Sequence, residues 1–395
     1  MTPRVAVVAG PDPGHAFPAV ALSCALRDRG VPVLFVSGTQ WREAVEREGV
    51  AFAAIDLFAP DPRDDDFGFV LWERSKQLAP GIARSLREFG ATLAVVDSIT
   101  VPGWFAADLA GVPRVELVPT SLQEPSSFLP PPGTGLERGR WPLGTLRDAW
   151  MRRLHMRSRE VGRAECRAAR VAIGLPPEGP PVLTVVATLP GLEPLRPDWP
   201  PRTEIVGPME WDPATADLAE PPGDGPLVFL ADSSATGRPQ TLLALAVEGL
   251  RGLRVACTKL GTPVEGMPEG FVAGPGRQAP LLDRAAAVVC AGGHGMVAKA
   301  LVRGLPLVIV PGPGDQRENA LRVERLGAGV HLPAARLTPA TLRAAVERVL
   351  RDPAYARAAR RIGRSAAGRG PAFAAERVLG AAAPSAATTR EGAPS

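Results

Sequence analysis

The amino-acid sequence predicts an α/β protein built from two doubly wound domains that face each other across a cleft. Short, continuously apolar runs such as VAVVAG and LPLVIV alternate with helical patterns, which is typical of parallel sheets covered by helices on both faces. The alternation occurs twice, and a proline-dense stretch at residues 189–225 separates the two series. The 395 residues suffice for two domains of ordinary size. We therefore expect the ligand site in the cleft, at the carboxyl ends of the strands.

The first series begins with the strand VAVVAG, a Pro/Gly turn and a helix that Gly30 ends at its C-cap. We expect the other strands at residues 31–38, 50–55, 92–98, 114–119, 181–188 and 203–207, and helices at 40–49, 69–89 and 104–111. Residues 121–144 are rich in Pro and Gly and predict a long loop, after which an Arg-rich amphipathic helix begins.

The second series has the same alternation. We expect strands at residues 226–233, 253–259, 286–292, 305–312 and 328–333, and helices at 241–250, 281–286, 296–304, 318–327, 339–351 and about 353–379. The predicted organisation is a first domain at 1–208, a Pro-rich linker at 209–225, a second domain at 226–380 and a disordered tail at 381–395.

The composition and charge exclude several classes of protein. With 45% hydrophobic and 22% charged residues the chain is a normal folding mixture rather than a disordered one. A net charge of +4, without a long basic block beside stackable aromatics, argues against nucleic-acid binding. The four cysteines form no CxxC pair, which favours free thiols in a reducing cytoplasm. Neither a signal-peptide pattern nor an apolar run of about 18 residues is present, so we expect a cytoplasmic protein.

A glycine-rich turn follows the expected strand VVCAG. Gly292, Gly293 and Gly295 stand where this strand meets the next helix, and backbone N–H groups with the positive end of a helix dipole gather there. Without Cβ atoms, the main chain lets an anion approach closely. Tight strand–helix turns with two glycines are common in α/β proteins, so the turn alone does not establish a ligand site.

A second candidate lies at the end of the neighbouring strand. Asp315 and Gln316 follow LPLVIVPG, where a carboxylate and an amide suit the vicinal hydroxyl groups of a sugar. Asp315 followed by Glu318 is also compatible with an ordinary acidic helix start.

At this point the sequence resembles a family. The segment GGHGMVAKALVRGLPLVIVPGPGDQRENALRVERLGAG is similar to the donor-binding signature of two-domain, GT-B type nucleotide-sugar glycosyltransferases, above all the bacterial group that acts on natural products and lipids. The resemblance covers residues 271–379 strongly and the rest of the chain loosely. It implies two Rossmann-like domains, with a C-terminal helix that returns toward the first domain.

The resemblance assigns the donor-binding residues. The upstream QAPLLDRAAAVVCAGG places Gln278 near the nucleotide base, and the turn at Gly292, Gly293, His294 and Gly295 near the diphosphate. Asp315 and Gln316 would hold the sugar. Ser233, Ser234 and Thr236, in ADSSATGRP, stand where the family contacts the diphosphate, although they equally suit an ordinary helix cap.

The same resemblance gives a role to two residues of the first half. PGHAFP follows the first strand and matches the family's Gly-His-x-x-Pro motif, which implies that His15 is the general base. Asp97 ends the strand LAVVD, and in many relatives an Asp at this place pairs with the base. The alternatives are a surface or helix-cap role for His15, and capping of the next helix by Asp97.

The resulting hypothesis is an inverting, metal-independent glycosyltransferase. It would move a hexose or deoxyhexose from a UDP- or dTDP-sugar to a hydroxyl of a lipophilic small molecule, with no cofactor besides this co-substrate, as a monomer or homodimer. The alternative is a transferase-like protein that has lost catalysis and activates another enzyme. Ala291 favours the alternative, because most relatives have His there; His15, Asp97, Asp315 and Gln316 oppose it.

Two further features of the sequence concern metal and membrane binding. Asp64–Asp66 fits an Asp-x-Asp metal motif, but it lies in a Pro-rich acidic loop away from any strand end, so no metal site is expected. Between residues 138 and 170 there are ten Arg and three acidic residues with interleaved Trp, Leu and Met. This helix is interpreted as having one core face and one solvated basic face, or as an acceptor-side element that makes weak contact with a membrane surface.

Overall fold

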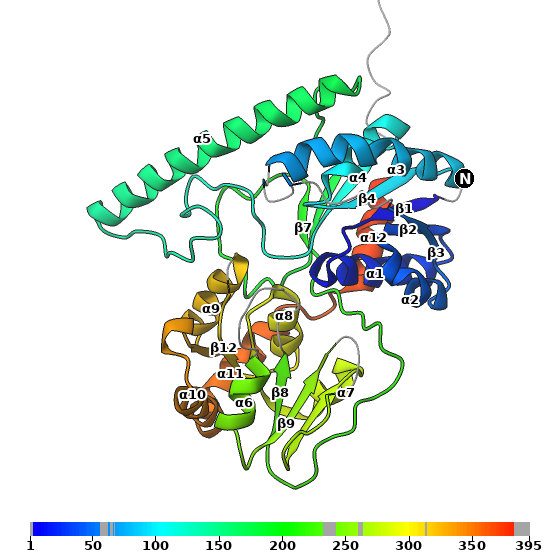
Figure 1. The fold of residues 1–395 in the computed structure, drawn as a ribbon. Coiled ribbons are helices and arrows are strands. Elements are labelled where there is room, and N and C mark those ends of the chain that lie inside the picture. The colour runs from blue at the N-terminus through cyan, green and yellow to red at the C-terminus, as the bar shows by residue number, and fades with distance from the viewer. Residues whose placement is uncertain are drawn as a thin grey trace, which may run out of the picture.

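The computed structural model describes residues 3–55, 62–63, 66, 68–231, 242–259, 264–312 and 314–382. Within these ranges the chain forms two parallel sheets, each covered by helices (Figure 1). The first has seven strands in the order β3-β2-β1-β4-β5-β6-β7, and the second has six in the order β10-β9-β8-β11-β12-β13. The predicted two-domain, doubly wound architecture is confirmed.

The first sheet has β1 at its centre, paired with β2 and β4. Its strands are β1 (Val5–Val8), β2 (Val33–Ser37), β3 (Ala51–Ala54), β4 (Leu93–Asp97), β5 (Arg114–Val118), β6 (Leu183–Val186) and β7 (Thr203–Ile205). Side chains alternate between faces, so Val5 and Val7 of β1 pack on one side and Ala6 and Val8 on the other. Burial on both faces explains why the strands are continuously apolar in sequence.

Helices cover both faces of this sheet. On one face lie α1 (Pro13–Arg27) and α2 (Arg42–Arg47), after a 3-10 turn at Thr39–Trp41. On the other lie α3 (Ser75–Phe89), which continues a π-helical turn at Phe69–Arg74, and α4 (Val101–Ala110). Pro13 in the first turn of α1 and Gly90 and Gly111 in the left-handed conformation after α3 and α4 supply the helix boundaries.

The second sheet is built in the same way around β8 and β11. Its strands are β8 (Leu227–Ala231), β9 (Arg254–Thr258), β10 (Phe271–Gly274), β11 (Ala285–Cys290), β12 (Leu307–Ile309) and β13 (Gly329–His331). One face is covered by α7 (Gln278–Arg284), α8 (His294–Val302), α9 (Asp315–Arg325) and α11 (Pro353–Arg364), and the other by α6 (Leu242–Gly249) and α10 (Pro339–Arg351). A 3-10 turn at Ala334–Arg336 precedes α10.

The C-terminal part differs from the single helix expected at about 353–379. The structure has two helices, α11 and α12 (Pro371–Ala382), because Gly368 and Gly370 adopt φ of 73° and 135° between them. Ala374, Ala375 and Val378 of α12 pack in the core of the first domain, against α1 (Figure 1). The expected return of the C-terminal helix is confirmed, and the range 226–380 thus contains a helix that packs with the other domain.

Strand β10 was not expected, because the run FVAG is short.

The passages between the domains are packed rather than free. Leu189 and Leu192 follow β6 and lie in the core of the second domain, while Trp211 packs edge-on against Phe17 of the first at a ring distance of 5.3 Å. Glu210 pairs with Arg303 of α8 at 2.9 Å. The predicted linker is therefore held by both domains. In the described part of the chain, no helix is long and apolar enough to cross a membrane.

Helix α5 (Pro142–Ala172) extends outside both layers (Figure 1). Of its 31 residues, Asp148, Cys166, Ala169 and Arg170 are buried, so its C-terminal part is the part that packs in the first domain. Arg170 pairs there with Asp108 of α4 at 2.7 Å.

Candidate active site

The centre of the site is a histidine–carboxylate pair. His15 lies in the first turn of α1, directly after β1, and Asp97 is the last residue of β4. Because β1 and β4 are neighbours in the sheet, their carboxyl ends meet at the same edge. His15 Nδ1 lies 2.8 Å from Asp97 Oδ1, and the Asp97 side chain is buried. The expected pairing of the two residues is present in the structure.

The second oxygen of Asp97 orients the carboxylate. Oδ2 accepts hydrogen bonds from the Thr100 hydroxyl at 2.8 Å and from the Ile99 N–H at 3.3 Å. The Thr100 hydroxyl also accepts from the Gly10 N–H at 2.9 Å, which ties the β4–α4 turn to the end of β1. Asp97 thus holds the turn before α4 with one oxygen and His15 with the other. It does not cap α4, whose N-cap residue is Thr100 and which has no side-chain cap hydrogen bond.

The environment changes the pKa of His15. Burial lowers it, but the hydrogen bond and charge of Asp97, with the charges of Asp12 and Asp315, outweigh burial and raise the pKa above its ordinary value. When Nδ1–H donates its hydrogen bond to Asp97, the neutral imidazole presents Nε2 as the basic nitrogen. The pair can therefore take a proton from a hydroxyl group placed at Nε2.

Asp315 enters the same site from the other domain. It begins α9, and its charge and that of His15 act on each other although the two residues belong to different domains. Burial raises the pKa of Asp315, and a hydrogen bond from Asn319 opposes the rise. Asn319 Nδ2 lies 3.2 Å from Asp315 Oδ2 and 3.0 Å from the carbonyl oxygen of Gly292, so one amide orients both the carboxylate and the glycine turn.

Gln316 is partly used by the protein itself. Its Oε1 accepts the N–H of Gly312 at 2.8 Å, which closes the turn between β12 and α9. A ligand beside this residue would therefore meet its amide as a hydrogen-bond donor.

The three glycines of the β11–α8 turn have different roles. Gly292 has φ of +86°, and a Cβ there would lie 2.7 Å from Ile309 Cγ2 and 2.9 Å from the carbonyl oxygen of Gln316. The backbone conformation and the close neighbours thus require a glycine at position 292. A Cβ at Gly293 or Gly295 would meet nothing within 4 Å. These two glycines face open space at the N-terminus of α8, where an anion can reach the backbone N–H groups.

His294, in the turn that the resemblance places near the diphosphate, has a buried side chain. It is only 4% exposed and lies beside Asn319 and the backbone of Ala187 from the first domain. Burial and the nearby charge of Arg322 lower its pKa to about 4, so the imidazole is neutral. His294 therefore offers this turn its backbone N–H rather than a cationic side chain. Ala291 is also buried, so a larger side chain there would have to displace its neighbours.

Gln278 belongs to a polar network at the start of α7. Its backbone N–H donates to Asp212 Oδ2 at 2.5 Å, and its side chain contacts Thr258 Oγ1 at 3.2 Å. Lys299 of α8 donates to Gln278 Oε1 at 2.9 Å. Burial lowers the pKa of Lys299, while Glu210 and Asp212 favour its charged form. Lys299 was not found from the sequence, because a single Lys inside an apolar helix pattern gives no sign of its partner.

Ser233, Ser234 and Thr236 lie outside the described residues, so their assignment stays a prediction. Strand β8 ends at Ala231, which pairs with Cys290 of β11. Of the rejected metal motif, Asp64 and Asp65 are likewise outside the described ranges, and Asp66 Oδ1 accepts the N–H groups of Gly68 and Phe69. Among the residues that the structure describes, no cluster of three His, Cys, Asp or Glu could hold a metal ion.

A buried polar cluster joins the domains beside the site, one turn after Asp315. Glu318 of α9 accepts the Gly133 N–H at 2.5 Å, and Arg322 donates to Ser121 Oγ at 2.5 Å and pairs with Glu318. Burial raises the pKa of Glu193, next to Arg322 and Ser121, to about 7. The loop at residues 121–139 is thus bound to the helix that carries Asp315 and Gln316. Nothing in the local sequence pattern predicts these contacts.

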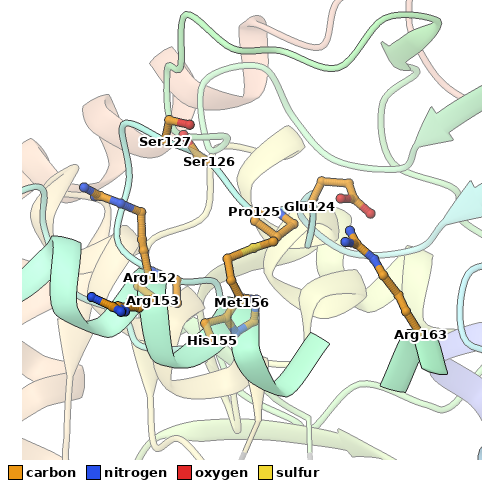
Figure 2. Close-up of a pocket in the computed structure, with 10 residues that line it drawn as sticks. Glu124, Pro125, Ser126, Ser127, Arg152, Arg153, His155, Met156 and Arg163 are labelled. Atoms are coloured by element: carbon orange, nitrogen blue, oxygen red, sulfur yellow. The ribbon is translucent and has the colours of Figure 1, made fainter. Parts of the chain in front are cut away.

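A pocket of about 590 Å³ lies between this loop and α5 (Figure 2). Glu124, Pro125, Ser126, Ser127 and Pro131 line it from the loop, and Arg152, Arg153, His155, Met156 and Arg163 from the helix. His15 and Asp97 are not among these residues. The pocket therefore lies beside the site, on the side of the loop, rather than at the dyad.

Comparison with known proteins gives consistent results. Residues 277–378 match the family model described as Erythromycin biosynthesis protein CIII-like, C-terminal domain. The chain is 30% identical over 400 residues to 4'-demethylrebeccamycin synthase of Lentzea aerocolonigenes, covering 90% of this chain and 93% of the relative.

Two solved structures illustrate the similarity of fold. The glycotransferase of kitacinnamycin has a TM-score of 0.75 at 21% identity, over 96% of this chain and 100% of that chain. The spinosyn rhamnosyltransferase complexed with thymidine diphosphate has a TM-score of 0.65 at 20% identity, over 95% and 100%. Both share the two-domain architecture of this chain.

Proposed function

This chain belongs to the family 1 natural-product glycosyltransferases and is an enzyme that transfers a sugar to a small-molecule acceptor, and from that premise we propose its mechanism. The enzyme transfers a hexose or deoxyhexose from a UDP- or dTDP-sugar to a hydroxyl of a lipophilic acceptor. Transfer proceeds without a metal ion and inverts the configuration at the anomeric carbon. The 2.8 Å contact between His15 and Asp97 is the observation that carries this proposal.

The acceptor is activated by His15. Nε2 takes the proton of the acceptor hydroxyl as that oxygen attacks the anomeric carbon, while Asp97 stabilises the imidazolium that forms. The bond between the anomeric carbon and the diphosphate oxygen breaks on the opposite face, and the nucleoside diphosphate leaves with the electron pair. A single displacement of this kind turns an α-linked donor into a β-linked product.

The second domain supplies the donor site. The backbone N–H groups at the N-terminus of α8, beside the open space at Gly293 and Gly295, stabilise the charge that grows on the diphosphate. Asp315 and the amide of Gln316 hold the sugar hydroxyls, and Gln278 lies toward the base. The thymidine diphosphate bound to the spinosyn rhamnosyltransferase supports dTDP as the first nucleotide to test.

The non-catalytic alternative has little support. It rested on Ala291, but the dyad is assembled, and the relative 4'-demethylrebeccamycin synthase is named as an enzyme. The helix N-terminus beside Ala291 still offers backbone N–H groups to an anion.

The experiment is a transfer assay with dTDP- and UDP-sugars and a panel of hydroxylated acceptors, followed by mass spectrometry. We expect a glycosylated product, unchanged activity in EDTA and, by NMR coupling, an anomeric configuration opposite to that of the donor. The His15→Ala variant should lower kcat by roughly 10²–10⁴-fold. His331→Ala is the matched control, because it removes another histidine that lies near a carboxylate, Glu324, but that belongs to the second sheet and not to the dyad. Near-normal turnover of His15→Ala, or retention of configuration, would contradict the mechanism.

A further inference from the structure

The exposed apolar side chains of this enzyme gather on α5. Of twelve exposed large hydrophobic residues in the described part of the chain, seven lie on α5 or at its N-cap: Trp141, Leu143, Leu146, Trp150, Leu154, Val161 and Val171. Trp141 is 80%, Leu143 82% and Trp150 62% exposed. Scattered single hydrophobic residues on a surface are ordinary, but a concentration on one element marks an interaction site.

Four of these residues form a continuous stripe. Leu143, Trp150, Leu154 and Val161 follow each other at spacings of seven, four and seven residues, which places them on one side of a helix over about 27 Å. The inner side of α5 is occupied by the preceding loop, since Arg152 donates to the carbonyl oxygen of Leu129 and Arg159 pairs with Glu124. The stripe therefore lies on the outer side of the molecule, which no described element covers.

Unpaired positive charge lies along α5 beside the stripe and on the neighbouring faces of the helix. Residues 138–170 contain ten Arg and three acidic residues. Six of these arginines are exposed and form no ion pair with any residue that the structure describes: Arg138, Arg140, Arg153, Arg157, Arg163 and Arg167. Exposed tryptophans and an apolar stripe flanked by arginines are the features of helices that lie in a membrane interface.

We propose that the outer side of α5 binds the surface of an anionic lipid membrane. Trp141, Leu143, Leu146 and Trp150 enter the boundary between headgroups and acyl chains, and the unpaired arginines contact lipid phosphates. The pocket between α5 and the loop, lined by Arg153 and Arg163 (Figure 2), leaves room for a headgroup beside the helix. The arrangement positions the loop side of the active site next to the lipid surface.

Charge favours a lipid surface over a second copy of the chain. Arg157 lies three residues after Leu154 and four before Val161, so it is within the stripe. Pairing two copies around the middle of the stripe would bring the two Arg157 side chains together, with further unpaired arginines on both sides. An anionic surface instead meets the same residues with opposite charge.

Vesicle flotation with the full chain tests the proposal. In 50 mM NaCl we expect binding to vesicles of phosphatidylcholine with 30% phosphatidylglycerol, and at least tenfold weaker partitioning into pure phosphatidylcholine vesicles or at 500 mM NaCl. Arg153→Glu/Arg157→Glu should weaken partitioning about tenfold or more, whereas Arg357→Glu/Arg364→Glu, with the same charge change on α11, should have a clearly smaller effect. Trp141→Ser/Trp150→Ser should also weaken it, and Leu195→Ser, at another exposed Leu, should not.

A spectroscopic measurement separates insertion from adsorption. Brominated acyl chains should quench tryptophan fluorescence in the wild type, and the quenching should be lost in Trp141→Leu/Trp150→Leu while partitioning is retained. Lack of binding to anionic vesicles at 50 mM NaCl would overturn the proposal. Equal effects of the charge reversals on α5 and on α11 would also overturn it. The same holds if analytical ultracentrifugation detects a self-association that Trp150→Ser abolishes and that competes with vesicle binding.

Discussion

His15 and Asp97 are 82 residues apart in the chain, yet the parallel pairing of β1 with β4 brings His15 Nδ1 to 2.8 Å from Asp97 Oδ1. The carboxylate cannot turn away, because Thr100 and Ile99 hold its other oxygen. The carboxylate thus holds the imidazole in one orientation.

Replacing Asp97 tests that geometry. We expect Asp97→Asn to lower kcat by about 10²–10⁴-fold with little change in the KM for either substrate, since the amide cannot stabilise the imidazolium. Thr100→Val removes one hydrogen bond to the distant oxygen and should have a much smaller effect. Equal losses in both variants, accompanied by a lower Tm, would indicate a structural role for Asp97.

The pH dependence of kcat/KM follows from the raised pKa of His15. Only the neutral imidazole is a base, so kcat/KM should fall as the pH decreases through a pKa above 6.5. Asp12 is one of the charges that raise this pKa, and its side chain makes no capping hydrogen bond to α1. The acid limb of Asp12→Asn should therefore move to lower pH. A limb that stays in place in this variant would show that another group controls the profile.

The glycine turn allows a comparison between two positions of the same loop. Gly292→Ala introduces a Cβ at φ of +86° and into contact with Ile309, so we expect a lower Tm and roughly 1–3 kcal/mol of destabilisation. Gly293→Ala meets nothing within 4 Å and should keep the wild-type Tm.

If the open space beside Gly293 receives the diphosphate, Gly293→Ala should still weaken binding of dTDP or UDP. Isothermal titration calorimetry of the folded variant measures this directly. An unchanged affinity of Gly293→Ala for both nucleotides would place the diphosphate elsewhere.

The buried Glu193 gives a prediction about stability. Its folded-state pKa of about 7 lies above the ordinary 4.5, so the folded protein retains a proton that the unfolded chain has lost. Stability should therefore fall as the pH rises from about 4.5 through 7. Glu193→Gln removes the ionisable group. At pH 8 this variant should therefore have a higher Tm than wild type, and its free energy of unfolding should be larger by roughly 1–3 kcal/mol.

At pH 5 wild type and Glu193→Gln should differ little, because both side chains are then neutral. Differential scanning fluorimetry across this range measures the difference. A variant that is less stable at pH 8 would mean that the carboxylate is held by Arg322 more strongly than burial opposes it.

Much of the candidate active site could be predicted from the sequence. The strands were visible because burial on both faces demands continuously apolar runs, as in VAVVAG and TLAVVD. Once the strands are assigned, parallel pairing puts their carboxyl ends at one edge, so His15 and Asp97 had to lie near each other. Asp315 followed from the same reasoning in the second sheet, and its role from the resemblance.

Other features were beyond local patterns. The strand β10 is too short to show periodicity, and the Gly368–Gly370 break lies inside an otherwise helical composition. His294 has a sequence position that suggests contact with a phosphate, but packing against Ala187 and Asn319 buries its side chain. The long-range hydrogen bonds from Gly133 to Glu318 and from Arg322 to Ser121 depend on how the two domains meet.

The sequence by itself therefore determined the two doubly wound sheets, the strand ends that carry His15, Asp97 and Asp315, and the glycine turn at Gly292. These follow from side-chain periodicity and backbone conformation, which are local properties. Tertiary structure alone decided that His294 is buried and neutral, that α9 is bound to the loop at residues 121–139, and that the apolar stripe of α5 faces outward. Burial and charge environment depend on residues distant in the chain, and no local pattern records which of them meet.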